Sequence, residues 1–195
     1  MKEIHEQPDS VRRTLEGRIT DKQVLINAFG AEAESIFSQT KAVQIVACGS
    51  SFYTGLVAKY WCEQIVGVPC HVEIASEFRY RKVAVQPNTL MVTISQSGET
   101  ADTLAALRDA TDENYLASLC LCNVPNSSLV RESDLCLMIN AGPEICVAST
   151  KAFTNQLTDL MLLVLALAKS QGMSPEDEAG YVSALNSVPS LLKET

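Results

Sequence analysis

The chain has 195 residues, a formal net charge of −8 and a hydrophobic content of 47%. This length supports one domain with a substantial core, and the composition is that of a globular protein rather than a disordered one. The negative charge disfavours nucleic acid and anionic membranes as partners. It permits a phosphate ligand, because a site built from N–H and O–H dipoles is local.

Residues 1–40 have a polar, helical pattern. A first helix is expected over Glu6–Glu16, with Gly17 as its stop, and a second over residues 22–37, interrupted or bent near Gly30. We interpret this segment as a lead-in arm rather than a part of the core.

Strands and helices alternate from residue 41 onward, which predicts parallel βαβ units with right-handed crossovers. The expected fold is therefore a doubly wound α/β domain over residues 41–172, followed by a helical segment over 173–195. The strands are expected at 43–48, 70–75, 89–95, 116–122 and 135–139, and the helices at 50–65, 100–110, 151–170 and from 175 onward.

The third expected strand ends in the turn Ser95-Gln96-Ser97-Gly98-Glu99-Thr100, and a helical pattern follows. A buried strand that leads through a polar turn into a helix builds an anion site, because free N–H groups and the helix dipole point at one spot. Ser95, Ser97 and Thr100 add hydroxyl donors, and Gly98 removes a Cβ that would block close approach. The pattern predicts a phosphate-bearing small molecule at the carboxyl edge of the sheet.

Two further turns have the same character. Cys48-Gly49-Ser50-Ser51 follows the first strand, and Val147-Ala148-Ser149-Thr150-Lys151 precedes the longest helix. Each turn alone is readily explained as a helix cap. Three such turns on one sheet edge favour a binding site.

Other polar residues leave alternatives open. Glu99 is expected in the first turn of its helix, where the dipole alone favours a carboxylate, so we do not interpret it as a catalytic base. Lys151 is either a phosphate partner or a surface charge. The segment 73–81 is either functional or a solvated loop with internal ion pairs. His71 is expected to be structural, and the sequence contains no dinucleotide-binding, P-loop or nucleophile-elbow motif.

The seven cysteines predict buried free thiols in a reducing cytosol, the alternative being a zinc site. No signal-peptide pattern is found, and the most apolar run, 160–168, is too short to span a membrane and is expected to be a buried helix. A cytoplasmic protein is expected.

Several segments together resemble one family. Through these segments the chain resembles the first half of the isomerase domain of the glucosamine-6-phosphate synthases, also called glutamine–fructose-6-phosphate aminotransferases (isomerising). The resemblance covers essentially the whole chain. The turn at 95–100 is typical of the wider sugar isomerase (SIS) fold family, and the runs at 73–81 and 147–154 are typical of the synthases. The matching segments are 2–8, 47–51, 73–81, 95–103, 122–125, 127–134 and 147–154.

The resemblance implies a SIS fold, a five-stranded parallel sheet with helices on both faces. It implies fructose 6-phosphate or glucosamine 6-phosphate as ligand, with ammonia released from glutamine, no metal or organic cofactor, and a homodimer. It places the phosphate at the turn after the third strand and the sugar at the other two turns. The implied substrate-binding residues are Ser50, Ser51, Ser95, Gln96, Ser97, Gly98, Thr100, Val147, Ala148 and Ser149.

The resemblance also implies missing parts. The family's glutaminase domain and its second SIS half, which supplies the lysine, glutamate and histidine of the reaction, have no counterpart here. We therefore expect an inactive fragment that self-associates through apolar surface, with 160–168 as a candidate. The alternatives are a non-catalytic sugar-phosphate sensor and a stand-alone phosphosugar isomerase, for which Glu77 and Glu99 are the nearby candidate bases.

Overall fold

Five parallel strands form a sheet at the centre of the molecule, as expected. In the computed structural model, which describes residues 2–111, 114–144 and 149–195, the strand order is β2-β1-β3-β4-β5. The neighbouring strands β1 and β3 align Ala47 with Ile94, so their carboxyl ends lie side by side. The strands are β1 (Ala42–Ala47), β2 (Cys70–Ile74), β3 (Thr89–Ser95), β4 (Ala117–Cys122) and β5 (Leu135–Met138).

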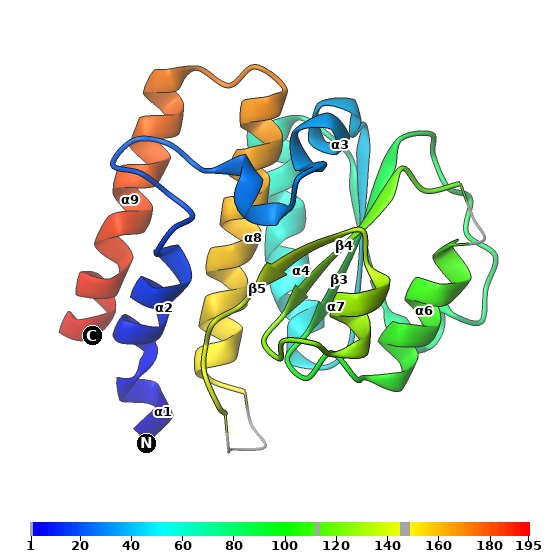
Figure 1. Cartoon of the computed structure of the whole chain (residues 1–195), viewed down its shortest axis with the longest axis horizontal. Coiled ribbons are helices and arrows are strands. Elements are labelled where there is room, and N and C mark those ends of the chain that lie inside the picture. The colour runs from blue at the N-terminus through cyan, green and yellow to red at the C-terminus, as the bar shows by residue number, and fades with distance from the viewer. Residues whose placement is uncertain (1, 112–113, 145–148) are drawn as a thin grey trace.

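Helices cover both faces of the sheet (Figure 1). Alternate side chains of each strand point to opposite faces. Leu119 and Leu121 of β4 join the main core beneath α4 (Ser50–Trp61) and α8 (Lys151–Ser170), whereas Cys120 and Cys122 face α6 (Ala101–Thr111) and α7 (Ser128–Glu132). The doubly wound α/β architecture is confirmed.

The remaining helices are short, apart from the last. The π-helical turn η2 (Cys62–Val66) continues α4, and α5 (Ala75–Phe78) follows β2 directly, so the segment expected to be either functional or a solvated loop is partly helical. The others are α1 (Lys2–His5), α2 (Gln7–Leu15), the 3-10 helix η1 (Ile26–Phe29), α3 (Ala33–Gln39) and α9 (Pro175–Glu194). None of the helices in the described part of the chain combines the length and apolarity needed to cross a bilayer.

The helix expected over residues 22–37, interrupted or bent near Gly30, is wrong in its first part, whereas the interruption at Gly30 is confirmed. The Thr20 hydroxyl accepts the N–H of Gln23, and an antiparallel bridge pairs Ile19 with Val24, so this stretch folds back on itself. Helical structure begins only at η1 and breaks again at Gly30, whose φ of 133° is left-handed.

The interpretation of residues 1–40 as an arm outside the core is also wrong, because this segment forms part of the core. Val11, Phe29 and Phe37 are each at most 1% exposed and belong to the main hydrophobic cluster. The apolar face of α2 lies against α8 and α9, and the three helices run side by side at one flank of the molecule (Figure 1).

This packing overturns the expectation that 160–168 leaves apolar surface uncovered. Most of that run is buried within the chain itself, including Leu162, Leu163 and Leu165. An all-round apolar helix is explained here by neighbours on several sides, since α2, α3 and α4 all contact α8.

A polar seam runs between α2 and α8 inside this packed layer. Asn155 donates to the hydroxyls of Ser10 (2.7 Å) and Thr14 (2.8 Å). Farther along, Arg18 pairs with Asp159 at 2.6 Å and also donates to the Met138 carbonyl oxygen. The pKa of Asp159 is raised well above its ordinary value. Burial is the main cause, and the adjacent Arg18 guanidinium offsets only part of the rise.

The buried pair yields a stability prediction. Arg18→Met leaves the Asp159 carboxyl buried without its partner and is expected to lower the free energy of unfolding by about 3–5 kcal/mol, measured by urea denaturation. Arg12→Met, which breaks the exposed pair with Asp9, is the matched control and is expected to cost far less. The double variant Arg18→Met with Asp159→Leu should recover most of the loss. Equal costs for the two single variants would contradict this account.

Candidate functional site

The first two predicted turns lie next to each other at the carboxyl edge of the sheet. The strand order reverses between β1 and β3, and in open α/β sheets this is where ligands bind. The turn at 49–51 leaves β1 and the turn at 95–100 leaves β3. Ser149, in the third turn, precedes α8 and lies after β5 on the same edge, while Val147 and Ala148 lie outside the described residues.

The turn after β3 is held by its own hydroxyl groups. Ser95 Oγ accepts the N–H of Gly98 at 3.0 Å and shares a hydrogen bond with Thr100 Oγ1 at 3.1 Å. Ser97 Oγ accepts the N–H of Glu99 at 3.2 Å. Ser95 is buried, whereas Gln96, Ser97 and Thr100 are half-buried, so Ser95 braces the turn and the other three face its accessible side.

Gly98 has a structural role that the sequence did not indicate. Its φ is 69°, and a Cβ built on it would lie 2.1 Å from Ser127 Oγ and 2.6 Å from Cys122 Sγ. The turn is therefore packed directly against the end of β4 and the start of α7. The absent side chain makes room for the protein's own atoms, in addition to any close approach by a ligand.

The N-terminus of α6 keeps its backbone donors available. In the described part of the chain, Leu104 N bonds back to the Thr100 carbonyl oxygen, but the N–H groups of Ala101, Asp102 and Thr103 have no acceptor. These are the groups that a helix offers to an anion. The hydroxyls of Ser97 and Thr100 belong to the same turn.

Glu99 does not lie in the first turn of its own helix, because α6 begins at Ala101. Its carboxylate instead accepts the N–H of Ser128 at 2.7 Å, at the N-terminus of α7. This backbone hydrogen bond lowers the pKa of Glu99 below its ordinary value. A helix N-terminus therefore explains the position of this carboxylate, but the helix is α7 and not, as expected, α6.

The third turn already contains an anion. Glu144 accepts hydrogen bonds from Ser149 Oγ (3.1 Å), Thr150 N (2.8 Å) and Ala152 N (3.3 Å), so its carboxylate sits at the N-terminus of α8. Glu144 is a site residue that was not predicted, and the available signal is its place directly after Gly142-Pro143, shortly before a predicted helix.

The turn after β1, at 48–51, is also tied to α8. Gln156 of α8 donates to Ser51 Oγ at 3.0 Å, whereas Ser50 is exposed.

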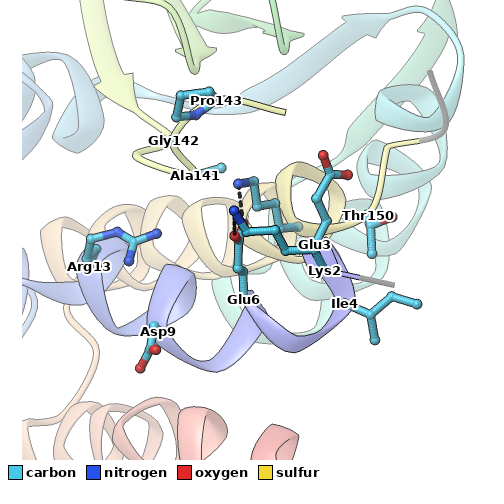
Figure 2. Close-up of a pocket in the computed structure, with 11 residues that line it drawn as sticks. Lys2, Glu3, Ile4, Glu6, Asp9, Arg13, Ala141, Gly142, Pro143 and Thr150 are labelled. Carbon is cyan, nitrogen blue, oxygen red and sulfur yellow. Dashed lines mark hydrogen bonds and ion pairs between the residues drawn. The ribbon is translucent and has the colours of Figure 1, made fainter. Parts of the chain in front are cut away.

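Lys151 is not a surface charge. It is 4% exposed, and its Nζ pairs with Glu6 at 2.7 Å. The pair lies beside a cavity of about 810 Å³ between the N-terminal helices and the segment before α8 (Figure 2). Glu6 reaches Lys151 from the far end of the chain, a contact that local sequence pattern could not indicate.

The charged segment after β2 forms internal ion pairs. Arg81 binds Glu73 through two hydrogen bonds, and Arg79 pairs with Asp102 of α6 at 2.8 Å while lying over the ring of Tyr80. These contacts support the ion-pair alternative for 73–81. The Arg79 contact also ties this segment to the first turn of α6.

The cysteines within the described residues are free thiols. Four are buried, at 62, 70, 120 and 122, while Cys48 and Cys136 are half-buried. Cys48 Sγ lies 3.9 Å from the Thr103 hydroxyl on the α6 side of the sheet. The described part of the chain contains no cluster of three or more His, Cys, Asp or Glu side chains suited to a metal ion.

Comparison with known proteins identifies the family to which this architecture belongs. Residues 36–166 match the SIS domain family. The chain belongs to the SIS domain family. It is 60% identical, over all 195 residues, to the glutamine–fructose-6-phosphate aminotransferase (isomerising) of Pseudomonas syringae pv. tomato, and 54% identical over 193 residues to that of Escherichia coli K12. It spans 32% of each of these relatives, about a third of their length.

Solved structures place the same SIS fold in proteins of different lengths. The C-terminal domain of the glucosamine-fructose-6-phosphate aminotransferase from Francisella tularensis superposes with a TM-score of 0.95 at 49% identity, over 97% of this chain and 54% of that one. A protein from Bacteroides fragilis, described as a putative phosphosugar isomerase, shares the fold at a TM-score of 0.69 and 19% identity, over 92% of this chain and 95% of that one.

The packing of the turn yields a second prediction. Gly98→Ala forces both a left-handed φ and a collision, and overpacking of this kind costs about 1–3 kcal/mol beyond the backbone strain. Gly17→Ala is the matched control, because Gly17 has a φ of 70° and its added Cβ would meet nothing within 4 Å. Urea denaturation should show the larger loss for Gly98→Ala. Losses of the same size would mean that the neighbouring residues give way freely.

Proposed function

We propose that this chain is the sugar-phosphate-binding half of the isomerase domain of an enzyme that makes glucosamine 6-phosphate from fructose 6-phosphate and glutamine. The 60% identity over the whole chain to aminotransferases named for this reaction supports the proposal. The single structural observation that carries it is the open N-terminus of α6 beside the hydroxyls of Ser97 and Thr100.

In the proposed complex the phosphate dianion sits at the α6 N-terminus. The N–H groups of Ala101 and Asp102 and the hydroxyls of Ser97 and Thr100 donate to its oxygens, with Gln96 at the rim. Ser95 contributes by bracing Thr100, and Gly98 by allowing the turn to pack. The α8 N-terminus is not the phosphate site in this proposal, because the Glu144 carboxylate already accepts its donors and repels a second anion.

The sugar itself is proposed to lie toward the first and third turns. Ser50 is the exposed hydroxyl there, and Ser51 and Ser149 are already hydrogen-bonded to Gln156 and Glu144. Their hydroxyl orientations are therefore set before a ligand arrives, which reduces the entropy lost on binding. Val147 and Ala148 complete the proposed site on the strength of the family resemblance.

The proposed unit comprises residues 41–172, with 1–40 attached to it and 173–195 leading toward a second SIS half. The contacts of Val11, Phe29 and Phe37 mean that the first segment belongs physically to the unit rather than serving as a loose arm. We also propose a cytoplasmic enzyme that forms a homodimer and that, in the whole protein, works with a glutaminase domain. The buried α8 is not the surface for that assembly.

Binding is the first test of this proposal. Fructose 6-phosphate or glucosamine 6-phosphate should raise the melting temperature of the purified chain in a concentration-dependent way, while fructose should not. Thr100→Val removes one charge-assisted hydrogen bond and is expected to weaken binding by about 1.5–3 kcal/mol, roughly tenfold or more. Thr150→Val, at the N-terminus already filled by Glu144, should leave the affinity nearly unchanged. Equal weakening by both variants would move the phosphate away from α6.

Turnover is the second test. The chain alone should not convert fructose 6-phosphate, because the resemblance assigns the lysine, glutamate and histidine of the reaction to the absent second half. The Glu99 carboxylate is committed to the α7 N-terminus and is not available as a base. A coupled assay for glucose 6-phosphate or glucosamine 6-phosphate formation checks this. Measurable turnover by the purified chain would favour the stand-alone isomerase.

A further inference from the structure

We propose that Cys120 and Cys136 form a peroxide-sensitive thiol pair that closes reversibly to a disulfide between β4 and β5. The proposal is independent of the sugar-phosphate site. It rests on the position of the two residues in the sheet and on the contrast with a second, sealed cysteine pair in the same chain.

The two thiols are placed together by strand register. Cys120 of β4 is the direct partner of Cys136 of β5, and both side chains point to the sheet face covered by α6 and α7. Neighbouring strands are about 4.8 Å apart, within the range of Cα separations that disulfides bridge, about 4.4–6.8 Å. The Cys136 thiol is the first cause of the raised pKa of Cys120, so the two side chains interact.

The two thiols differ in the way that a reactive and a resolving cysteine must differ. Cys136 is half-buried on the edge strand β5, whereas Cys120 has no exposed surface. The neighbouring Cys120 thiol lowers the pKa of Cys136, and the positive charge of Arg18 acts in the same direction. The neighbouring Cys136 thiol and burial raise the pKa of Cys120. Cys136 is therefore the thiol that a small oxidant meets first, as the better thiolate.

The neighbouring sulfur atoms do not compete for this role. Met138 Sδ lies 3.6 Å from Cys136 Sγ and has no thiol to offer. Cys122 is the register partner of Met138, not of a cysteine, and its thiol contacts Ser127 Oγ at 3.3 Å and the Val124 carbonyl oxygen at 3.6 Å.

The oxidant in the proposed reaction is hydrogen peroxide or another hydroperoxide. The Cys136 thiolate attacks one peroxide oxygen, the O–O bond breaks, and a sulfenic acid forms with release of water or the corresponding alcohol. The Cys120 thiol then attacks the sulfenic sulfur, an S–S bond replaces the S–O bond, and a second molecule leaves as water. Two thiols are oxidised by two electrons and one peroxide is reduced. A dithiol reverses the step by exchange.

The pair Cys62 and Cys70 serves as an internal control. The Cys62 thiol and burial raise the pKa of Cys70, and each thiol of this pair is only 1% exposed. An influence of one thiol on the pKa of the other is therefore common to both pairs. Access and thiolate character distinguish the Cys120–Cys136 pair.

The test is native oxidation followed by peptide mapping. The folded chain is treated with hydrogen peroxide, free thiols are blocked with an alkylating agent, and tryptic cleavage at Arg108, Arg131 and Lys151 separates Cys120 from Cys136. We expect a cross-linked peptide, joined through Cys120 and Cys136, that disappears on dithiothreitol treatment. The peptide with Cys62 and Cys70 should remain fully alkylated. Oxidation of that pair first, or a bond from Cys136 to a different cysteine, would overturn the proposal.

Three variants sharpen the result, with circular dichroism as the check on folding. Cys136→Ser should abolish the cross-link and leave Cys120 reduced. Cys120→Ser should leave Cys136 as a sulfenic acid that a 1,3-dicarbonyl reagent traps. Cys122→Ser is the matched control on the same strand face and should still form the cross-link. Direct conversion of Cys136 to sulfinic acid in the unaltered chain, with no cross-link, would refute the pairing.

Discussion

The close packing of the turn after β3 against β4 and α7 is the constraint on which the candidate site depends. Gly98 lies where no Cβ fits, because Ser127 and Cys122 fill that space. The turn therefore cannot shift away from the sheet, and Ser95 fixes its conformation through the Gly98 N–H and the Thr100 hydroxyl. The direction in which α6 leaves the sheet follows from this. An anion site made of backbone N–H groups needs such rigidity. Its donors bind an anion well only if they already point at one position before the anion arrives.

The N-termini of α6, α7 and α8 differ in what accepts their backbone N–H groups. Glu144 fills the N-terminus of α8, and Glu99 fills that of the shorter α7, whereas the first N–H groups of α6 have no acceptor among the described residues. Internal carboxylates thus neutralise the competing positive ends. Among these three N-termini, that of α6 is left for the proposed phosphate, and its dipoles act locally in a chain whose net charge is −8.

Much of this could be predicted from the sequence, because its main signals are local. Strand and helix periodicity predicted all five strands, and hydroxyl residues beside glycine marked the turn at 95–100. The helix predicted over 22–37 failed on local contacts, since the Thr20 hydroxyl accepts the N–H of Gln23 and Ile19 pairs with Val24. Other errors concern contacts between distant segments, such as that of Glu6 with Lys151. The same applies to the apolar run at 160–168, whose composition indicated burial but not by which neighbour.

The seam between α2 and α8 shows how those distant contacts bear on the site. The contacts of Glu6, Asn155 and Arg18 run along α8 from its first turn to its middle. Each gives a partner to a buried polar atom, so the N-terminal segment must dock in one register for all three contacts to form. Because the first of these contacts holds Lys151 directly after Ser149 and Thr150, the position of the third turn is set by residues at the start of the chain. The proposed phosphosugar-binding unit is therefore incomplete without its first eighteen residues, even though the chemistry proposed for it begins only at Ser50.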